Sequence, residues 1–196
     1  SPMVRARLEK VNGMKYKSEF DEGLSTRERQ REQGFRMRTL NLSYRTELSD
    51  SEYIVEGRQL AGKYDWNSDL PAEVSLEERF AERMGIKLGD LLTFNVHEVL
   101  IIAKVINLRK VKWNSFQPNF FILFQSGVLD DAPATYLASM GGLDKMERMN
   151  YQNLIVKSFP NVSVIDVTRT VERVLKISDQ MVLALRFMAY LSIMAG

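Results

Sequence analysis

Apolar and polar positions alternate most clearly between residues 73 and 124, and they do so with two different periods. Leu92, Phe94 and Val96 alternate with polar residues, which predicts a strand with one buried face. The stretch from Val99 to Leu108 is almost wholly apolar, and such a run is typical of a strand covered on both faces. This region therefore predicts adjacent strands.

A short amphipathic helix is predicted before these strands. Ser75 followed three residues later by Glu78 matches a capping box, and Gly85 stands where a left-handed C-cap is favoured. The apolar residues between them recur at helical spacing: Leu76, Phe80, Ala81 and Met84. Residues 87–90 then form a predicted turn.

More strands are predicted toward the N-terminus. Apolar and polar residues alternate over residues 4–9, and Asn12-Gly13 is a strong hairpin signal, so Met14 to Phe20 should return antiparallel. Phe35–Tyr44 and Tyr53–Arg58 have the composition of two further strands. Residues 21–33 are highly charged without an apolar stripe, which is typical of a solvated loop or a frayed helix.

Beyond residue 124 the patterns are shorter. They predict a strand at 136–140, a short helix at 144–150, strands at 153–157 and 162–167, and a long helix whose N-cap is Asp166 or Thr168. The alternation of strands and helices predicts an α+β fold.

Composition narrows the function without identifying it. The 196 residues have a net charge of only +2, which does not favour nucleic-acid binding, and they include no cysteine. His97 is the only histidine, so a histidine-dependent catalytic triad and a histidine-rich metal site are disfavoured. The sequence has no GxSxG elbow, Walker loop or Rossmann glycine pattern. These features predict a protein that is not an enzyme and that binds no metal or cofactor.

Neighbouring carboxylates are the remaining candidates for acid/base chemistry. The pairs Asp130-Asp131, Glu77-Glu78 and Asp65/Asp69 lie on predicted loops or a helix, where adjacent side chains point in different directions. We interpret all of them as solvated surface charges, and His97 as a residue of the turn between two strands.

An ordered set of motifs resembles a known family. The motifs are VSLEERFAERMGIKLGDLLTF at 74–94, LRKVKWNSF at 108–116 and PNFF at 118–121, preceded by NLSYR at 41–45 and IVEGR at 54–58. This order resembles the extracytoplasmic, MacB-like periplasmic core domain of FtsX-like ABC transporter permeases. It is most similar to the YbbP-type permeases, which are encoded beside a lysophospholipase-type esterase.

The resemblance implies a two-lobed domain exposed to the periplasm on the bacterial inner membrane. One discontinuous, porter-like α/β lobe would comprise residues 1–34 and 136–178, and a strand-rich lobe with one helix would comprise residues 35–135. The domain would be non-catalytic, and a separate ABC ATPase subunit would bind the ATP. Its movements would export or extract a hydrophobic substrate such as a lipid or lipoprotein. The alternative is an FtsX-like docking platform that regulates a periplasmic hydrolase; an esterase partner and a homodimer also stay open.

The resemblance also suggests functional residues. Arg109, Trp113, Phe116 and Asn119 belong to the shared motifs and are candidates for contact with a partner or between the lobes. Single-stranded nucleic-acid grooves mix cations and aromatics in a similar way, but simple alternation along a strand explains residues 109–116 equally well.

The C-terminal segment is the candidate for membrane coupling. Between Met181 and Ala195 only Arg186 is charged, and the family begins a transmembrane helix near this point. We interpret residues 179–196 as a stalk helix and the start of a truncated transmembrane helix, since a complete span needs about twenty apolar residues. An ordinary amphipathic helix is the alternative. The coupling candidates are Met181, Leu185, Arg186 and Met188.

Overall fold

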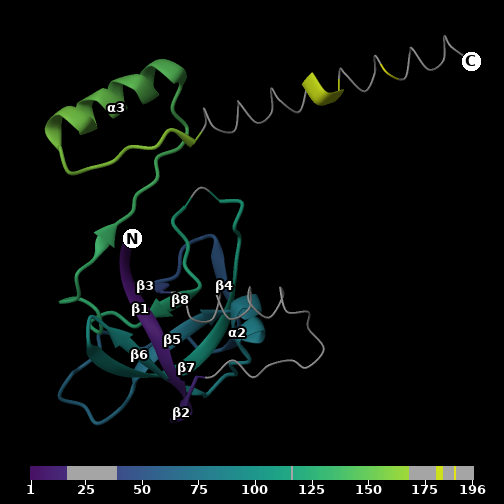
Figure 1. Ribbon diagram of the computed structural model, residues 1–196, viewed down its shortest axis with the longest axis vertical. Coiled ribbons are helices and arrows are strands. Elements are labelled where there is room, and N and C mark those ends of the chain that lie inside the picture. Colours follow the sequence, from purple (N-terminus) through teal and green to yellow (C-terminus); the bar gives the residue numbers. More distant parts are fainter. Residues whose placement is uncertain (17–38, 116, 168–179, 183–187, 189–196) are drawn as a thin grey trace, which may run out of the picture. The chain divides into compact units, whose positions relative to one another are not determined.

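The computed structural model describes residues 1–16, 39–115, 117–167, 180–182 and 188, and the chain divides into two units. Unit 1 comprises Ser1–Met140 and contains all of the described strands, whereas unit 2 comprises Gly141–Gly196. The described part of the chain is thus a mixed α/β structure with many strands and few helices (Figure 1).

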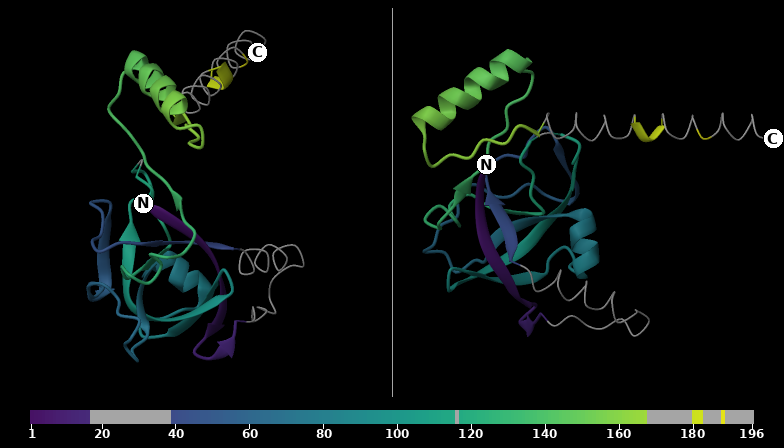
Figure 2. Two further views of the ribbon diagram at one scale, coloured as in Figure 1. Left: turned by 90° about the vertical axis from the view of Figure 1, so that its left-hand side faces the viewer. Right: turned by 45° about the horizontal axis from the view of Figure 1, so that its top comes forward.

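The strands of unit 1 are arranged in a ring. They are β1 (Pro2–Val11), β3 (Leu40–Tyr44), β8 (Ile122–Phe124), β5 (Ala72–Glu77), β7 (Val99–Val111) and β6 (Leu91–Val96). Each pairs with the next in this order, and β6 pairs again with β1. The result is a barrel-like sheet whose strands curve around one interior (Figure 2).

Shorter elements extend this ring. β2 (Met14–Lys15) and β9 (Thr135–Tyr136) pair with β1, and β4 (Glu52–Gly57) pairs with the C-terminal half of β7. Asn12 and Gly13 both have positive φ angles, as the predicted Asn-Gly hairpin requires. The predicted return strand beyond residue 16 and the charged segment 21–33 lie outside the described residues.

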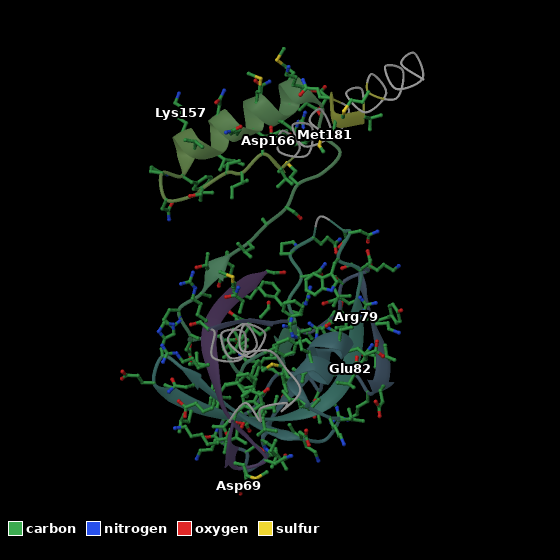
Figure 3. All side chains as sticks on the ribbon, turned by 45° about the vertical axis from the view of Figure 1, so that its right-hand side comes forward. Asp69, Arg79, Glu82, Lys157, Asp166 and Met181 are labelled. Atoms are coloured by element: carbon green, nitrogen blue, oxygen red, sulfur yellow. The ribbon has the colours of Figure 1, made fainter. Side chains whose placement is uncertain are left out.

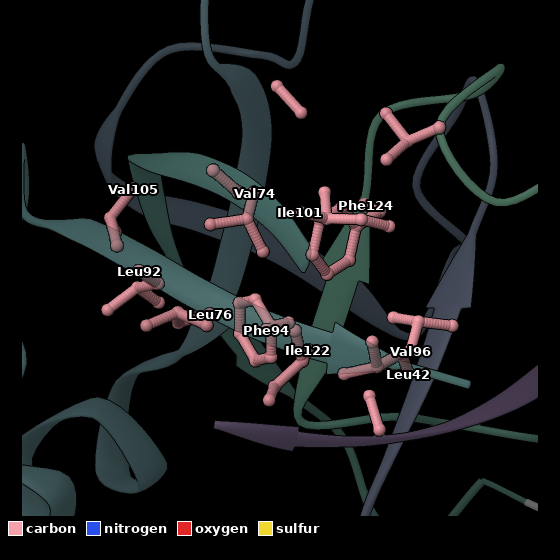
Figure 4. Close-up of a cluster of buried hydrophobic side chains, with 14 of the residues drawn as sticks. Leu42, Val74, Leu76, Leu92, Phe94, Val96, Ile101, Val105, Ile122 and Phe124 are labelled. Atoms are coloured by element: carbon pink, nitrogen blue, oxygen red, sulfur yellow. The ribbon is translucent and has the colours of Figure 1, made fainter. Parts of the chain in front are cut away.

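The core of unit 1 fills the interior of the ring. Its side chains come from alternate positions of the six strands of the ring. The labelled ones are Leu42, Val74, Leu76, Leu92, Phe94, Val96, Ile101, Val105, Ile122 and Phe124 (Figure 4). Leu92, Phe94 and Val96 are all buried, so the strand predicted at 92–96 is confirmed. Helix α2 (Glu78–Met84) adds Phe80, Ala81 and Met84 to the same core.

The predicted helix start is wrong. Ser75 does not cap α2, because it lies inside β5, where its side chain is fully buried and contacts Asn107. The N-cap is Glu77, whose carboxylate accepts a hydrogen bond from the backbone N–H of Phe80 at 2.7 Å. The predicted C-cap is confirmed, since Gly85 is left-handed with φ 69°.

A β-bulge in β7 changes which face its side chains occupy. Val74 pairs with Val105, but Ser75 pairs with Asn107, so Ile106 has no partner on β5. One inserted residue reverses the alternation, because successive side chains point to opposite faces. Val105 and Leu108 therefore pack against the core, whereas Asn107 and Arg109 are buried on the other face.

The strand predicted to be covered on both faces is only partly so. Before the bulge, Leu100 and Ile102 are each 54% exposed, and alternation rather than a continuous apolar environment describes β7. The apolar composition of β7 before the bulge has two sources. One face packs in the core, and the solvent-facing side also carries apolar residues.

Unit 2 contains α3 (Lys145–Ser158), which begins with a capping box formed by Asp144 and Glu147. The helix predicted at 144–150 is present but continues through the strand predicted at 153–157, which is therefore wrong. The strand predicted at 162–167 is also wrong, since residues 162–166 have no strand structure and Val167 is helical. Arg148 contacts Asp166 at 3.8 Å, which connects α3 to the segment that follows it.

The predicted lobe boundaries differ from the two units. β1, assigned from the sequence to a lobe with residues 136–178, pairs in unit 1 with β3 and β6. The two-lobed, MacB-like arrangement stays a prediction.

Gly57 provides a test of the bulge. A Cβ atom on Gly57 would lie 2.1 Å from the Ile106 carbonyl oxygen, and its φ is +91°. We expect Gly57→Ala to lower the free energy of unfolding by about 3 kcal/mol, because backbone strain adds to the steric overlap. Gly13→Ala is the matched control: its φ is +77° but a Cβ there meets nothing within 4 Å, so it should cost only about 1 kcal/mol. Urea denaturation measures both, and equal costs would contradict the close approach of Gly57 to the bulge.

Candidate functional site

The centre of the candidate site is Arg109, whose side chain is fully buried in unit 1. Its Nε donates to Glu52 Oε1 at 3.2 Å, and its Nη1 donates to the Ser75 carbonyl oxygen at 3.0 Å. Burial lowers the pKa of this guanidinium, whereas the Glu52 carboxylate opposes that shift. Because guanidinium keeps its proton in proteins, Arg109 is a buried cation.

The same guanidinium holds the backbone before β8. Its Nη2 donates to the Phe120 carbonyl oxygen, and its Nη1 donates to that of Phe121 at 3.4 Å. Arg109 thereby fixes two consecutive peptide groups of the connection between β7 and β8.

Glu52 is the counterion of this cation and is shared by a second arginine. Its carboxylate is fully buried and also accepts from Arg45 Nη2 at 2.9–3.0 Å and from the Ser49 backbone N–H at 3.1 Å. A buried carboxylate with this many donors is satisfied, and its removal would leave two cations without their partner.

Polar side chains fix the same connection at a second point. Asn119 Nδ2 donates to Ser115 Oγ at 3.1 Å, and Ser51 Oγ donates to Asn119 Oδ1 at 3.1 Å. The Lys112 backbone N–H also donates to the Ser51 carbonyl oxygen at 2.8 Å. Lys112 and Asn119 are therefore tied to Ser51, which precedes β4, whereas Phe120 and Phe121 are tied to Arg109.

This connection displays two half-exposed aromatic rings, which we call the aromatic surface: Trp113, 48% exposed, and Phe121, 43% exposed. Their ring centroids are 4.7 Å apart, and Phe121 stacks on Phe80 of α2 at 5.3 Å. Exposed aromatics held on a rigid support are typical of protein–protein contacts.

The surface of α2 beside Phe80 is polar. Arg79 and Glu82 lie on its outer side (Figure 3), and Glu78 pairs with Lys110 at 3.2 Å. The exposed apolar side chains beside α2 are thus those of Trp113 and Phe121.

The structure places the partner-contact and membrane-coupling residues predicted from the sequence in different environments. Arg109 cannot touch a partner directly because it is buried; it positions Phe121, and Asn119 supports the same connection. Trp113 is exposed, and Phe116 lies outside the described residues. Met181 and Met188 are 63% and 61% exposed, while Leu185 and Arg186 are not described.

Sequence reasoning missed Glu52, Arg45 and Phe121. A fully buried arginine in an otherwise apolar strand requires a carboxylate partner, but the sequence does not say which of many acidic residues supplies it.

The other chemical candidates have structural explanations. Glu77 is buried as the N-cap of α2, so its interpretation as a solvated charge is wrong. Asp130 accepts from the Gly127 N–H at 3.1 Å, and Asp65 accepts from the Asn67 N–H at 2.9 Å. His97 is an exposed turn residue with a positive φ, as is Glu98. No group of acidic or histidine side chains in the described ranges could hold a metal ion.

Comparison with known proteins gives one relative. The chain is 34% identical over 176 residues to an uncharacterized ABC transporter permease, YbbP of Escherichia coli (strain K12). The chain is related to YbbP. This relationship confirms the permease resemblance of the motifs. The match covers 88% of this chain but only 19% of YbbP, so the chain spans a small part of that permease.

The other comparisons add no second relationship. No protein-family model matches the chain, and no solved structure matches it. Within the described residues, no helix combines the length and the apolar character that a membrane crossing needs.

Arg109→Met tests the buried network. We expect it to lower the free energy of unfolding by about 3 kcal/mol, since it leaves the Phe120 and Phe121 carbonyl oxygens without their donor and weakens the pairing of Glu52. Lys110→Met removes the neighbouring cation, which is exposed, and should change the free energy by less than about 0.5 kcal/mol.

Chemical denaturation measures the stability of both variants. Near-UV circular dichroism, to which Trp66 and Trp113 both contribute, reports whether the aromatic side chains keep their packing. A cost for Arg109→Met no larger than that of Lys110→Met would contradict the role of Arg109.

Proposed function

We propose that this chain is a non-catalytic, extracytoplasmic domain of a bacterial ABC transporter permease. The observation that carries the proposal is the 34% identity with YbbP along 88% of the chain. The order of the motifs between residues 41 and 121 supports the finer assignment to an FtsX-like permease with a MacB-like periplasmic core domain. The domain would face the periplasm from the inner membrane.

ATP would be bound by a separate ABC ATPase subunit, as the relationship to an ABC permease implies. Movements driven by that subunit would reach the domain through residues 168–196, with Met181, Leu185, Arg186 and Met188 as coupling positions. The transported compound would be hydrophobic, such as a lipid or a lipoprotein.

Helix α3 supports the view that the domain belongs to a larger assembly. None of its residues is fully buried, and its apolar side chains Met146, Leu154 and Val156 are each more than half exposed. An isolated helix of this length is marginally stable in water, so contacts with other parts of a permease would stabilise it.

A docking platform for a periplasmic hydrolase is the second candidate, and the aromatic surface favours it. Trp113 and Phe121 are exposed, yet Arg109 and Asn119 hold their backbone rigidly, as a recognition site requires. Co-purification of a partner through these rings would favour docking, whereas substrate efflux that is independent of both rings would favour transport.

Accessibility in the full-length permease tests the proposed location. The chain has no cysteine, so Asp69→Cys, at an exposed loop position, introduces a single label once cysteines elsewhere in the permease are removed (Figure 3). We expect a membrane-impermeant maleimide to label it in intact cells whose outer membrane has been made permeable.

Ser43→Cys is the matched control, because Ser43 is fully buried and should react only after denaturation. Labelling of Asp69→Cys only after lysis of the inner membrane would place the domain in the cytosol and overturn the proposal.

A further inference from the structure

Unit 1 contains a cavity of about 300 Å³ that is separate from the aromatic surface. Leu123 of β8, Asn107 of β7 and Ile54 of β4 contribute to its wall from the sheet, and the segments after β3 and β4 add Arg45, Leu48 and Leu60. The volume is at the small end of the range for ligand pockets.

The connection after β4 is held in place beside this cavity. Arg58 forms an ion pair with Glu73, whose carboxylate also accepts from the Ala61 N–H at 2.6 Å. Burial would raise the pKa of Glu73, but these hydrogen bonds outweigh burial and lower it. Leu60 therefore belongs to a fixed wall.

Arg45 is the cation of the cavity wall. Among the described residues, only its Nη2 has hydrogen-bond acceptors, both on Glu52, and its Nε is buried without one. Asn107 is neutral and already engaged at both side-chain polar atoms: its Nδ2 donates to the Arg58 carbonyl oxygen at 2.7 Å, and its Oδ1 contacts Ser75. Arg45 therefore has unused charged donors at this cavity, and Thr46 and Gln59 add neutral polar side chains to the same wall.

Arg45 is the one cation among the described residues that line the cavity, and its Nη1 is the donor available to an anion. Glu52 is shared between Arg45 and Arg109, so one buried carboxylate faces two guanidinium groups. Glu77, the other buried carboxylate near Arg109, keeps its charge as the N-cap of α2 but does not line the cavity. Glu47 also lines the cavity, but it is exposed at the surface, where water screens its charge.

We propose that this cavity binds a small amphiphile with a carboxylate head and a short alkyl body. The carboxylate would accept a charge-assisted hydrogen bond from Nη1 of Arg45, and Leu48, Ile54, Leu60 and Leu123 would contact the alkyl body. The inference goes beyond the proposed function and does not depend on transport.

Three probes of equal chain length test the proposal on the 196-residue chain: octanoate and octylammonium below their micelle concentrations, and octanol below its solubility limit. Amide chemical shifts in ¹⁵N-resolved NMR spectra measure binding. We expect octanoate to shift the amides of Thr46, Gln59 and Leu60, and to bind about tenfold more tightly than octanol. Octylammonium should bind more weakly than either.

Single substitutions test the two parts of the site. Arg45→Gln should weaken octanoate binding about tenfold, and Glu47→Gln should strengthen it about twofold by removing a like charge. Arg79→Gln on α2 removes an exposed arginine away from the cavity wall and should leave the affinity unchanged.

Leu60→Trp keeps the test decisive if Arg45→Gln fails to fold, because Leu60 is only half-buried and the larger ring would fill the cavity. It should abolish the shifts at Thr46 and Gln59. Equal binding of octanoate and octanol to the unaltered chain, or undiminished octanoate binding by Leu60→Trp, would overturn the proposal.

Discussion

One extra residue in β7, Ile106, determines how the polar interior of unit 1 is organised. If β7 kept its register with β5, Asn107 and Arg109 would point into the apolar core with Val105, where a guanidinium would have no partner. The bulge moves both side chains to the other face, where Glu52 of β4 supplies the counterion. Gly57 is needed at the end of β4 because the Ile106 carbonyl oxygen occupies the place of a Cβ atom.

Glu52 then connects two surface features that are far apart in the sequence. Through Arg109 it contributes to the position of Phe121 in the aromatic surface, and through Arg45 it contributes to the wall of the cavity. A buried carboxylate shared by two arginines is sensitive to the loss of any member, because each remaining charge would be left in a medium of low dielectric constant. A change at one of these features is therefore expected to alter the packing of the other.

Local signals in the sequence predicted local structure well. The Asn12-Gly13 hairpin, the alternation over 92–96 and the cap at Gly85 each depend on a few adjacent residues, and all are confirmed. Strand β4 was also predicted within one residue at each end, since β-branched and aromatic residues dominate it.

The predictions were wrong where contacts between residues distant in the sequence determine the secondary structure or the burial. Ser75 matches a capping box, but pairing of β5 with β7 and β8 extends the strand through it. The run from Val99 to Leu108 is almost wholly apolar, so its pattern does not show where a bulge lies. The change of face at Ile106 and the burial of Arg109 therefore could not be predicted. Residues 153–157 have strand propensity, yet they continue a helix that starts at a strong capping box. The relationship to an ABC permease was predicted from ordered motifs, whereas the site depends on Glu52, which no motif indicated.

The register of β5 against β7 is the most direct test of this account, and NMR of the isotopically labelled chain measures it. Cross-strand nuclear Overhauser effects between backbone protons should connect Val74 with Val105 and Ser75 with Asn107, with no such contact from Ile106 to β5. Contacts that continue without interruption, with Ser75 opposite Ile106 and Leu76 opposite Asn107, would contradict it. In that register Arg109 would face the core, and the arginine network, the aromatic surface and the cavity would all need another explanation.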